Sequence, residues 1–262
     1  MKGITLVKLG GSLITDKSTP FTARGDMIKR LCAEIKDAQP MPLVVGHGGG
    51  SFPHQSAAKY GTKDGVTNEK SWEGFCVVQN DAAKLNRIVV DALLGAGVNA
   101  VSFQPSASCI TERGKIRKWN LHVLERMIND GIVPIPYGDV ALDRKQGMSI
   151  VSTEEILLFL AGKLKAKRII LCGKVDGVFT ADPGKDANAT LVKEITKKNF
   201  PEIRSYLTGS DGTDVTGGML NKVEQALEMA KKGATVEIIN GMKEGLLKRV
   251  LAGETGLGTT IK

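Results

Sequence analysis

Three short glycine-rich stretches carry the residues best suited to bind an anion. They read KLGGS at residues 8–12, GHGGGS at 46–51 and CGKVDG at 172–177. Glycine lets backbone N–H groups approach a phosphate closely, and each stretch also holds a lysine or a histidine. One such stretch alone is typical of a plain turn, whereas three of them favour a phosphate site. None matches the Walker pattern GxxxxGKS, and no GxGxxG lies between an expected strand and helix, so neither of those nucleotide sites is supported.

His54 ends the longer stretch GHGGGSFPH, in the first turn of an expected helix. A single histidine is more often structural, but this one follows a glycine loop at the positive end of a helix, which favours contact with an anion. We expect anions nearby to favour its protonated ring. His47 and His122 are interpreted as structural.

The glycine-rich stretches fall where expected strands end and helices begin. Apolar runs predict strands, and apolar residues at helical spacing predict helices. Ser51 and Asn120 are expected helix caps, and Ser152 with Glu155 forms a capping-box pattern. This alternation predicts a three-layer αβα sandwich around a mostly parallel sheet, with ligands at the carboxyl ends of the strands. The expected strands are 4–10, 42–46, 99–103, 132–138, 168–173 and 235–241, and the expected helices are 51–61, 68–94, 120–131, 152–164 and 217–233.

Composition narrows the class of protein. With 262 residues and 42% apolar content, the chain can bury a sizeable core, and we expect a single domain over residues 1–262. The net charge is +8, but the lysines are dispersed and aromatic residues are only 5%, so small polyanions are favoured over nucleic acid. No signal peptide or membrane span is indicated, which predicts a cytoplasmic, soluble protein. The scattered Cys32, Cys76, Cys109 and Cys172 predict buried thiols and no zinc site or disulfide framework.

Four motifs in order resemble the amino acid kinase superfamily over nearly the whole chain. They are KLGGS, GHGGG, VDGVFTADP at 175–183 and DVTGGMLNKV at 214–223. Within that superfamily, KLGGSLITDK with Lys17, together with the histidine of GGGSFPH, resembles the isopentenyl phosphate kinases, and fosfomycin kinases share much of the pattern. The resemblance implies transfer of the γ-phosphoryl group of ATP to isopentenyl phosphate, with Mg²⁺ accompanying ATP, in a homodimer. It also implies an acceptor-phosphate lobe at about 1–150 and a nucleotide lobe at about 151–262.

The resemblance assigns roles to individual residues. The catalytic set is Lys8, Lys17, His54 and Lys222, with Lys17 stabilising the transition state. The acidic residue that orients the lysines corresponds to Glu154. Acceptor contacts are expected from Gly49, Gly50, His54, Gly138 and Asp139. Nucleotide contacts are expected from Lys8, Gly10, Gly11, Ser12, Asp176, Gly177, Phe179, Asp182, Gly217 and Lys222, although Asp182-Pro183 also fits a simple turn. No protein-borne metal site is expected.

Two departures from the family pattern affect the site. Pro53 stands where glycine is common, so one N–H group that could face phosphate is missing. Glu154 stands within Ser152-Thr153-Glu154, where Ser-Gly-Asp is usual, which keeps the charge on a longer arm.

The acceptor itself stays open between isopentenyl phosphate and fosfomycin or another small phosphate or phosphonate. An isoprenoid tail needs an apolar pocket, which Trp72, Phe75, Cys76 and Val77 could line, although their spacing is also typical of core residues. A nucleotide-binding sensor or storage protein without turnover is the alternative from another class. The presence of Lys8, Lys17 and Lys222 argues against it.

Overall fold

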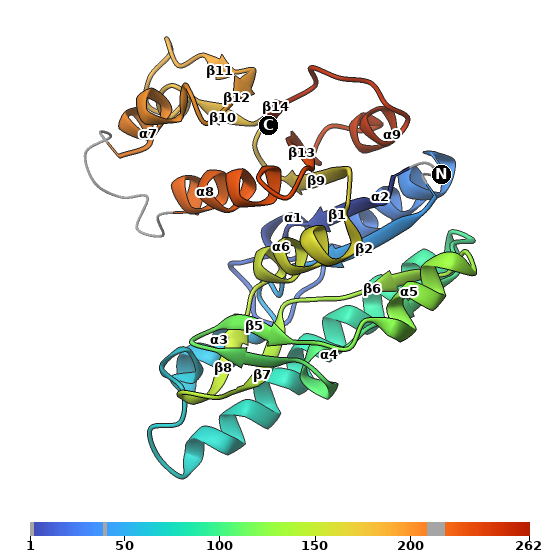
Figure 1. The fold of residues 1–262 in the computed structure, drawn as a ribbon, viewed down its shortest axis with the longest axis vertical. Coiled ribbons are helices and arrows are strands. Elements are labelled where there is room, and N and C mark those ends of the chain that lie inside the picture. The colour runs from blue at the N-terminus through green and yellow to red at the C-terminus, as the bar shows by residue number, and fades with distance from the viewer. Residues whose placement is uncertain (1–2, 39–40, 209–217) are drawn as a thin grey trace.

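The computed structural model describes residues 3–38, 41–208 and 218–262 of the chain. A six-stranded sheet forms the centre, in the order β12-β14-β13-β9-β1-β2 (Figure 1). All its neighbours are parallel except the pair β13 and β14. The bounds are β1 Thr5–Leu9, β2 Leu43–His47, β9 Arg168–Gly173, β12 Glu194–Ile195, β13 Thr235–Asn240 and β14 Thr259–Ile261.

Two further parallel strands lie beyond β2. β3 (Ala100–Ser102) pairs with β6 (Val133–Ile135), and a parallel bridge between His47 and Tyr137 ties the end of β2 to the residues after β6. The expected strands at 99–103 and 132–138 are therefore confirmed, both somewhat shorter than predicted.

Helices cover both faces of the central sheet. Each buried strand alternates its side chains between two apolar clusters: Leu6 and Ile169 lie in one, whereas Val7 and Ile170 lie in the other. Such alternation is what a strand buried on both sides requires. The Leu6 face is covered by α5 (His122–Asn129), α6 (Thr153–Leu164) and α8 (Gly218–Ala230), and the Val7 face by α2 (Gly25–Ala38), α4 (Lys70–Gly95) and α9 (Leu246–Leu251).

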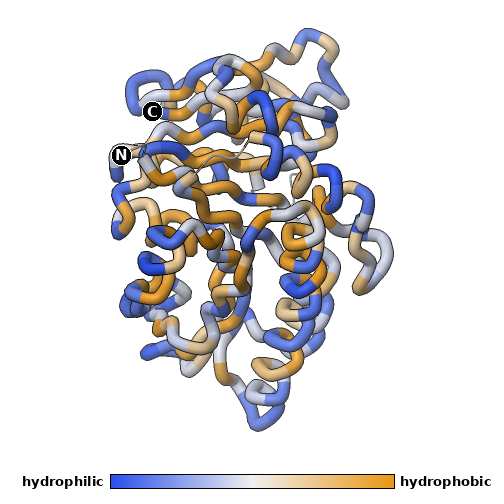
Figure 2. The backbone as a smooth tube through the Cα atoms, turned by 90° about the vertical axis from the view of Figure 1, so that its right-hand side faces the viewer, coloured by the Kyte–Doolittle hydropathy of each residue, from blue (hydrophilic) through white to orange (hydrophobic). Residues whose placement is uncertain are grey.

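The predicted three-layer αβα sandwich is thus confirmed. Hydrophobic residues run along the central strands (Figure 2). The remaining elements are α1 Gly11–Ile14, α3 Pro53–Lys59, α7 Phe200–Thr208, β10 Val178–Phe179, β11 Leu191–Val192 and the short 3₁₀ helices Thr62–Asp64 and Pro105–Ala107. No helix among the described residues is both long and apolar enough to cross a membrane.

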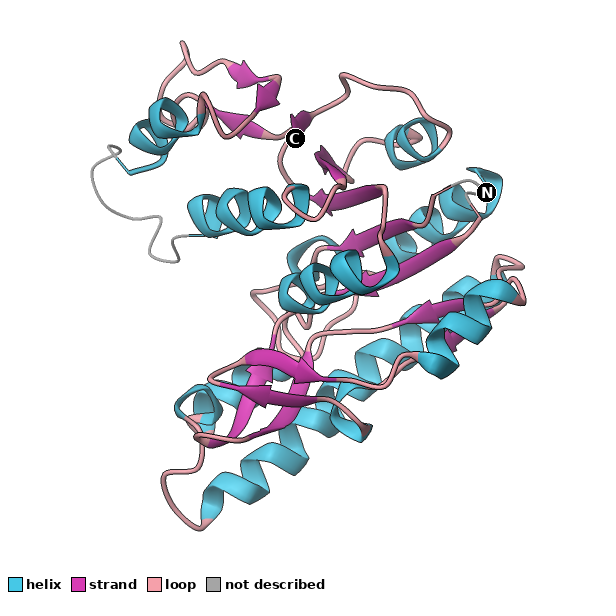
Figure 3. Cartoon of the chain, in the orientation of Figure 1, coloured by secondary structure: helices cyan, strands magenta, loops and turns pink. Residues whose placement is uncertain are grey.

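A second sheet of four strands was not predicted from the sequence. Its order is β5-β4-β7-β8, and it lies beside α3 and the start of α4, at one end of the molecule (Figure 3). Its strands are short and carry charged residues, as in KIRK, so the apolar signal is weak. The bounds are β4 Ile110–Glu112, β5 Lys115–Lys118, β7 Asp139–Asp143 and β8 Gly147–Val151.

The expected caps are realised in part. Ser152 caps α6, because its hydroxyl accepts the N–H of Glu155. The carboxylate of Glu155 does not complete a capping box: it accepts the N–H of Ile116 and pairs with Lys115, which fastens β5 to α6.

The other two caps differ from the prediction. The residue before α3 is Phe52, not Ser51, and no side chain caps this helix. The residue before α5 is Leu121, although the side chain of Asn120 still accepts the N–H of His122.

The loops after β1 and β2 lie against each other through backbone atoms. A Cβ atom on Gly11 would lie 2.5 Å from the amide nitrogen of Gly50, and one on Gly48 would lie 2.8 Å from the amide nitrogen of Gly11. Real Cβ contacts are longer, so only glycine fits at this crossing.

We predict that Gly11→Ala lowers the free energy of unfolding by about 1 to 3 kcal/mol, because the new methyl group overlaps backbone that cannot retreat cheaply. Gly25→Ala is the matched control, since a Cβ atom there meets nothing within 4 Å. Urea denaturation of both variants measures the effect, and equal stability of the two would contradict the prediction.

Candidate active site

A cavity of about 380 Å³ opens at the carboxyl ends of β1, β2 and β9. The three glycine-rich stretches meet there, as the sequence predicted. The strand order explains the position. The chain continues from β1 to β2 on one side of β1, and from β9, which pairs with the other side of β1, toward β12 and β13, so the chain leaves these two neighbouring strands in opposite directions. Ligands of open α/β sheets bind at such a switch point.

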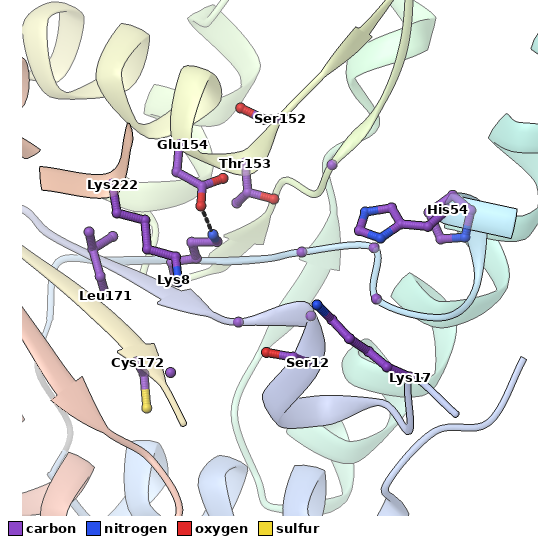
Figure 4. A pocket seen from close by; sticks show the side chains of 18 of the residues that line it. Lys8, Ser12, Lys17, His54, Ser152, Thr153, Glu154, Leu171, Cys172 and Lys222 are labelled. Atoms are coloured by element: carbon purple, nitrogen blue, oxygen red, sulfur yellow. Dashed lines mark hydrogen bonds and ion pairs between the residues drawn. The ribbon is translucent and has the colours of Figure 1, made fainter. Parts of the chain in front are cut away.

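Lys8, Glu154 and Lys222 meet on one side of the cavity (Figure 4). The ammonium of Lys8, at the end of β1, donates to the carboxylate of Glu154 in the first turn of α6. Burial raises the pKa of Glu154, but the charges of Lys8 and, more weakly, Lys222 outweigh it and hold that pKa below its usual value. Glu154 therefore reaches Lys8 despite its longer arm.

Lys17 and His54 lie on the other side of the cavity (Figure 4). Lys17 comes from the segment between α1 and α2, and His54 from the first turn of α3. Burial, together with the charges of Lys17 and Lys8, lowers the pKa of His54, whereas Glu154 opposes the shift. These surroundings disfavour the protonated ring, which was expected from the sequence beside an anion. A bound phosphate would reverse this, because an anion favours the charged ring.

The arrangement suits two mutually repelling anions. A phosphate monoester carries a charge of about −1.5 to −2 at neutral pH. Lysines on both sides of the cavity, with one histidine, can hold such a group against a second phosphate and stabilise the charge that moves between them.

Gly10 lines the cavity together with its neighbours. Its N–H, however, donates to the carbonyl of Cys172 at 2.8 Å, which fastens the end of β1 to β9 and leaves no N–H for a phosphate. Gly11 and Ser12 line the cavity at the start of α1, and Gly49 and Gly50 line it after β2. Their backbone N–H groups are candidate donors to phosphate oxygens.

Gly138 and Asp139 also line the cavity. The N–H of Gly138 donates to the carbonyl of His47, and one carboxylate oxygen of Asp139 accepts the N–H of Ser106 at 3.0 Å. The other oxygen, Oδ1, is buried and has no hydrogen-bond partner in the part of the chain that the structure describes. Asp139 is only 2% exposed, and burial raises its pKa to about 6.

We predict that Asp139→Asn flattens the pH dependence of stability. The pKa of Asp139 is higher in the folded protein than in the unfolded chain. The free energy of unfolding of the wild-type protein therefore falls as the pH rises from the unfolded pKa to the folded pKa. The loss amounts to about 2 to 3 kcal/mol, and the amide does not titrate. Urea denaturation of both proteins at about pH 4.5 and about pH 7.5 tests this, and parallel pH dependence would show that Asp139 is not perturbed.

The expected nucleotide residues after β9 do not line the cavity. Asp176 accepts from the side chains of Asn240 and Lys243, which lowers the pKa of its carboxyl. Gly177 packs closely against Thr259, because a Cβ atom on Gly177 would overlap the Thr259 hydroxyl.

Phe179 and Asp182 lie farther along the same segment. Phe179 belongs to β10 and pairs with Leu191 of β11. The carboxylate of Asp182 accepts the N–H of Gly184 within a turn, as expected if Asp182-Pro183 only forms a turn. Gly217 falls outside the described residues.

Several cavity residues were missed by sequence reasoning. On the side formed by the end of β9, α8 and β13, Lys174, Val175, Met219 and Ile238 line the cavity. Lys174 had a signal, because it lies inside the third glycine-rich stretch. Met219 and Ile238 had none, since they resemble core residues of a helix and a strand.

The part of the cavity beside α3 and α4 is apolar, but not through the residues expected to line an apolar pocket. It is lined by Ala57, Val78 and Ile150. Trp72, Phe75, Cys76 and Val77 do not line it: Trp72 is 46% exposed, and Phe75 packs against a small cluster that includes Val78. The residue of α4 that lines the cavity is Val78, next to the expected Val77. Helical spacing alone could not distinguish the two positions.

The cysteines form no disulfide, as expected, but Cys76 is exposed and not buried. Burial raises the pKa of Cys172, which lines the cavity, to about 12. Among the residues placed by the structure, no group of three or more His, Cys, Asp or Glu side chains could hold a metal ion.

The sequence matches the amino acid kinase family over residues 3–240. It is 39% identical to the isopentenyl phosphate kinase of Methanothermobacter thermautotrophicus, with 98% of each chain covered. It is 33% identical to the isopentenyl phosphate kinase of Methanocaldococcus jannaschii, with 96% of each covered. A crystal structure of isopentenyl phosphate kinase superposes with a TM-score of 0.85 at 35% identity, covering 99% of this chain and 100% of that one.

Proposed function

The chain belongs to the amino acid kinase family, and on that premise we propose that it transfers the γ-phosphoryl group of ATP to isopentenyl phosphate, giving isopentenyl diphosphate. Near-full-length similarity to isopentenyl phosphate kinases carries this proposal. The fosfomycin alternative is not favoured by these relatives. The cavity adds a physical reason, because cations and backbone donors surround it and its acceptor end is apolar.

On the donor side, Lys8 and Lys222 would hold the ATP phosphates, with the N–H groups of Gly11 and Ser12 beside them. Glu154 would keep the ammonium of Lys8 in place through their ion pair. In this assignment residues from about 151 to 262 form the nucleotide lobe. Mg²⁺ would be bound as its complex with ATP and would offset phosphate charge, because the described residues hold no group of three or more His, Cys, Asp or Glu side chains suited to a metal ion.

On the acceptor side, Gly49, Gly50 and His54 would hold the monophosphate, bordered by Gly138 and Asp139. The apolar residues at that end would receive the isoprenoid tail, which has no hydrogen-bonding groups to satisfy. In this assignment residues from about 1 to 150 form the acceptor lobe. One domain with both lobes brings acceptor and donor to the same cavity.

We also propose that the protein is a homodimer that works in the cytoplasm, where ATP is supplied. β3 is the outer strand of the pair β3 and β6, with Val101 exposed on it. Further exposed apolar side chains lie on the neighbouring helices, at Leu94 of α4 and Val123 of α5. Exposed apolar groups at a sheet edge are suited to a subunit interface.

The direct test supplies isopentenyl phosphate and fosfomycin separately with MgATP. We expect ADP release with isopentenyl phosphate, and a product heavier by one phosphoryl group by mass spectrometry. Turnover of fosfomycin alone would reassign the acceptor. ATP binding without turnover of either compound would favour the non-catalytic sensor.

We predict that Lys17→Ala lowers kcat by about 100-fold or more while the KM for ATP changes little. A cation placed where charge develops stabilises the transition state more than the ground state. Steady-state kinetics with both substrates varied measures this effect. Equal kcat in variant and wild type would remove Lys17 from catalysis.

We predict that His54→Ala lowers kcat/KM for isopentenyl phosphate by roughly 10- to 150-fold. This corresponds to the loss of one charge-assisted hydrogen bond of about 1.5 to 3 kcal/mol. His54→Gln should recover part of the activity, because its amide N–H can still donate. ATP affinity by calorimetry should stay nearly unchanged, since His54 serves the acceptor.

Two results would return His54 to a structural role. One is an unchanged kcat/KM in the alanine variant. The other is a parallel loss of ATP affinity and thermal stability.

A further inference from the structure

Thr15 lies at the end of α1, fully buried, between the two glycine loops. Its hydroxyl donates to the carbonyl of Gly11 at 2.8 Å and accepts the N–H of Ser51 at 3.0 Å. A hydroxyl group has one proton to donate and can accept at the same time, so both contacts can be made at once. One side-chain atom therefore joins the loop after β1 to the loop after β2.

The glycines where the two loops meet have no side chains that could hold the loops together. Gly50 lies so close to Thr15 that a Cβ atom there would overlap the Thr15 hydroxyl. Without the hydroxyl, the N–H of Ser51, a residue only 5% exposed, would lose its acceptor. A buried unsatisfied N–H is costly, so the loop would move to satisfy it.

The same hydroxyl lies two residues before Lys17. The segment that carries Lys17 begins and ends on a bridge between Thr15 and Ala23. It contacts the acceptor loop again through Phe21, whose N–H donates to the carbonyl of Ser51 at 3.3 Å. Thr15 and Ser51 thus connect the donor loop, the acceptor loop and the base of the Lys17 segment.

We propose that Thr15 is a positioning residue whose hydroxyl sets the separation of the two phosphate-binding loops, and with it the distance between the donor and acceptor phosphates. The inference rests on the proposed kinase function. Phosphoryl transfer depends mainly on positioning, and a misplacement of about 1 Å can cost about 100-fold in rate. Thr15 touches neither substrate in this role.

The test uses two pairs of variants that differ by one hydroxyl group. Thr15→Val is compared with wild type, because valine keeps the γ-methyl group of threonine and has a second methyl group in place of the hydroxyl. Thr15→Ala is compared with Thr15→Ser, because both lack the γ-methyl group and only serine has the hydroxyl. Removal of the hydroxyl should lower kcat by about 10- to 100-fold in both pairs, with both KM values changed less than about threefold. Thr15→Ser should retain most of the wild-type kcat.

Thr62→Val is the matched control. Thr62 is also fully buried, but its hydroxyl has no hydrogen-bond partner among the described residues, and it does not line the cavity. Its kcat should equal that of wild type. Should Thr15→Val not fold, the alanine and serine pair still isolates the hydroxyl.

Hydrogen–deuterium exchange separates this inference from the function on which it rests. The Ser51 amide should lose protection in Thr15→Val and keep it in Thr15→Ser, whatever the substrate. Unchanged protection, unchanged kcat, or equal losses in the serine and alanine variants would overturn the positioning role. Wild-type protein that turns over neither isopentenyl phosphate nor fosfomycin would overturn the proposed function instead.

Discussion

The whole site depends on one backbone contact, where the loops after β1 and β2 cross at the carboxyl edge of the sheet. Gly11 and Gly48 make this crossing through backbone atoms, and the Thr15 hydroxyl, which lies against Gly50, joins the two loops beside it. Parallel pairing of β1 with β2, in which Lys8 lies opposite Gly46, delivers both loops to the same edge. The sheet thereby brings two anion-binding turns together before any side chain takes part.

Charge is the second constraint. The cavity collects Lys8, Lys17 and Lys222, and the carboxylate of Glu154 offsets part of that charge. Lys8 and, more weakly, Lys222 hold the pKa of the buried Glu154 below its usual value, and the carboxylate in turn accepts a hydrogen bond from Lys8. The longer arm of Glu154 therefore matters less than its position, since the first turn of α6 starts directly beside the end of β1.

Sequence reasoning reached the central sheet, its helices and the cavity, because apolar strands and glycine-rich ends leave a strong local signal. It missed the sheet of β4, β5, β7 and β8, whose order is set by pairing between distant residues and by Asp143, which accepts N–H groups from Gly114 and Lys145. It also did not predict that the N–H of Gly10 donates to the carbonyl of Cys172. Motifs indicate which residues gather, but not which hydrogen bonds they have already made.

Among the described residues, the cavity is lined by four lysines, Lys8, Lys17, Lys174 and Lys222, and by only two acidic side chains, Asp139 and Glu154, and this excess of positive charge favours anions. Burial and neighbouring cations lower the pKa of His54, and burial followed by Arg24 lowers that of Lys174, so both groups are pushed toward losing charge. An anion close to His54 would oppose this shift and favour proton uptake by the ring. Because the charges of Lys17 and Lys8 act on the same ring, such an anion would also interact with both lysines.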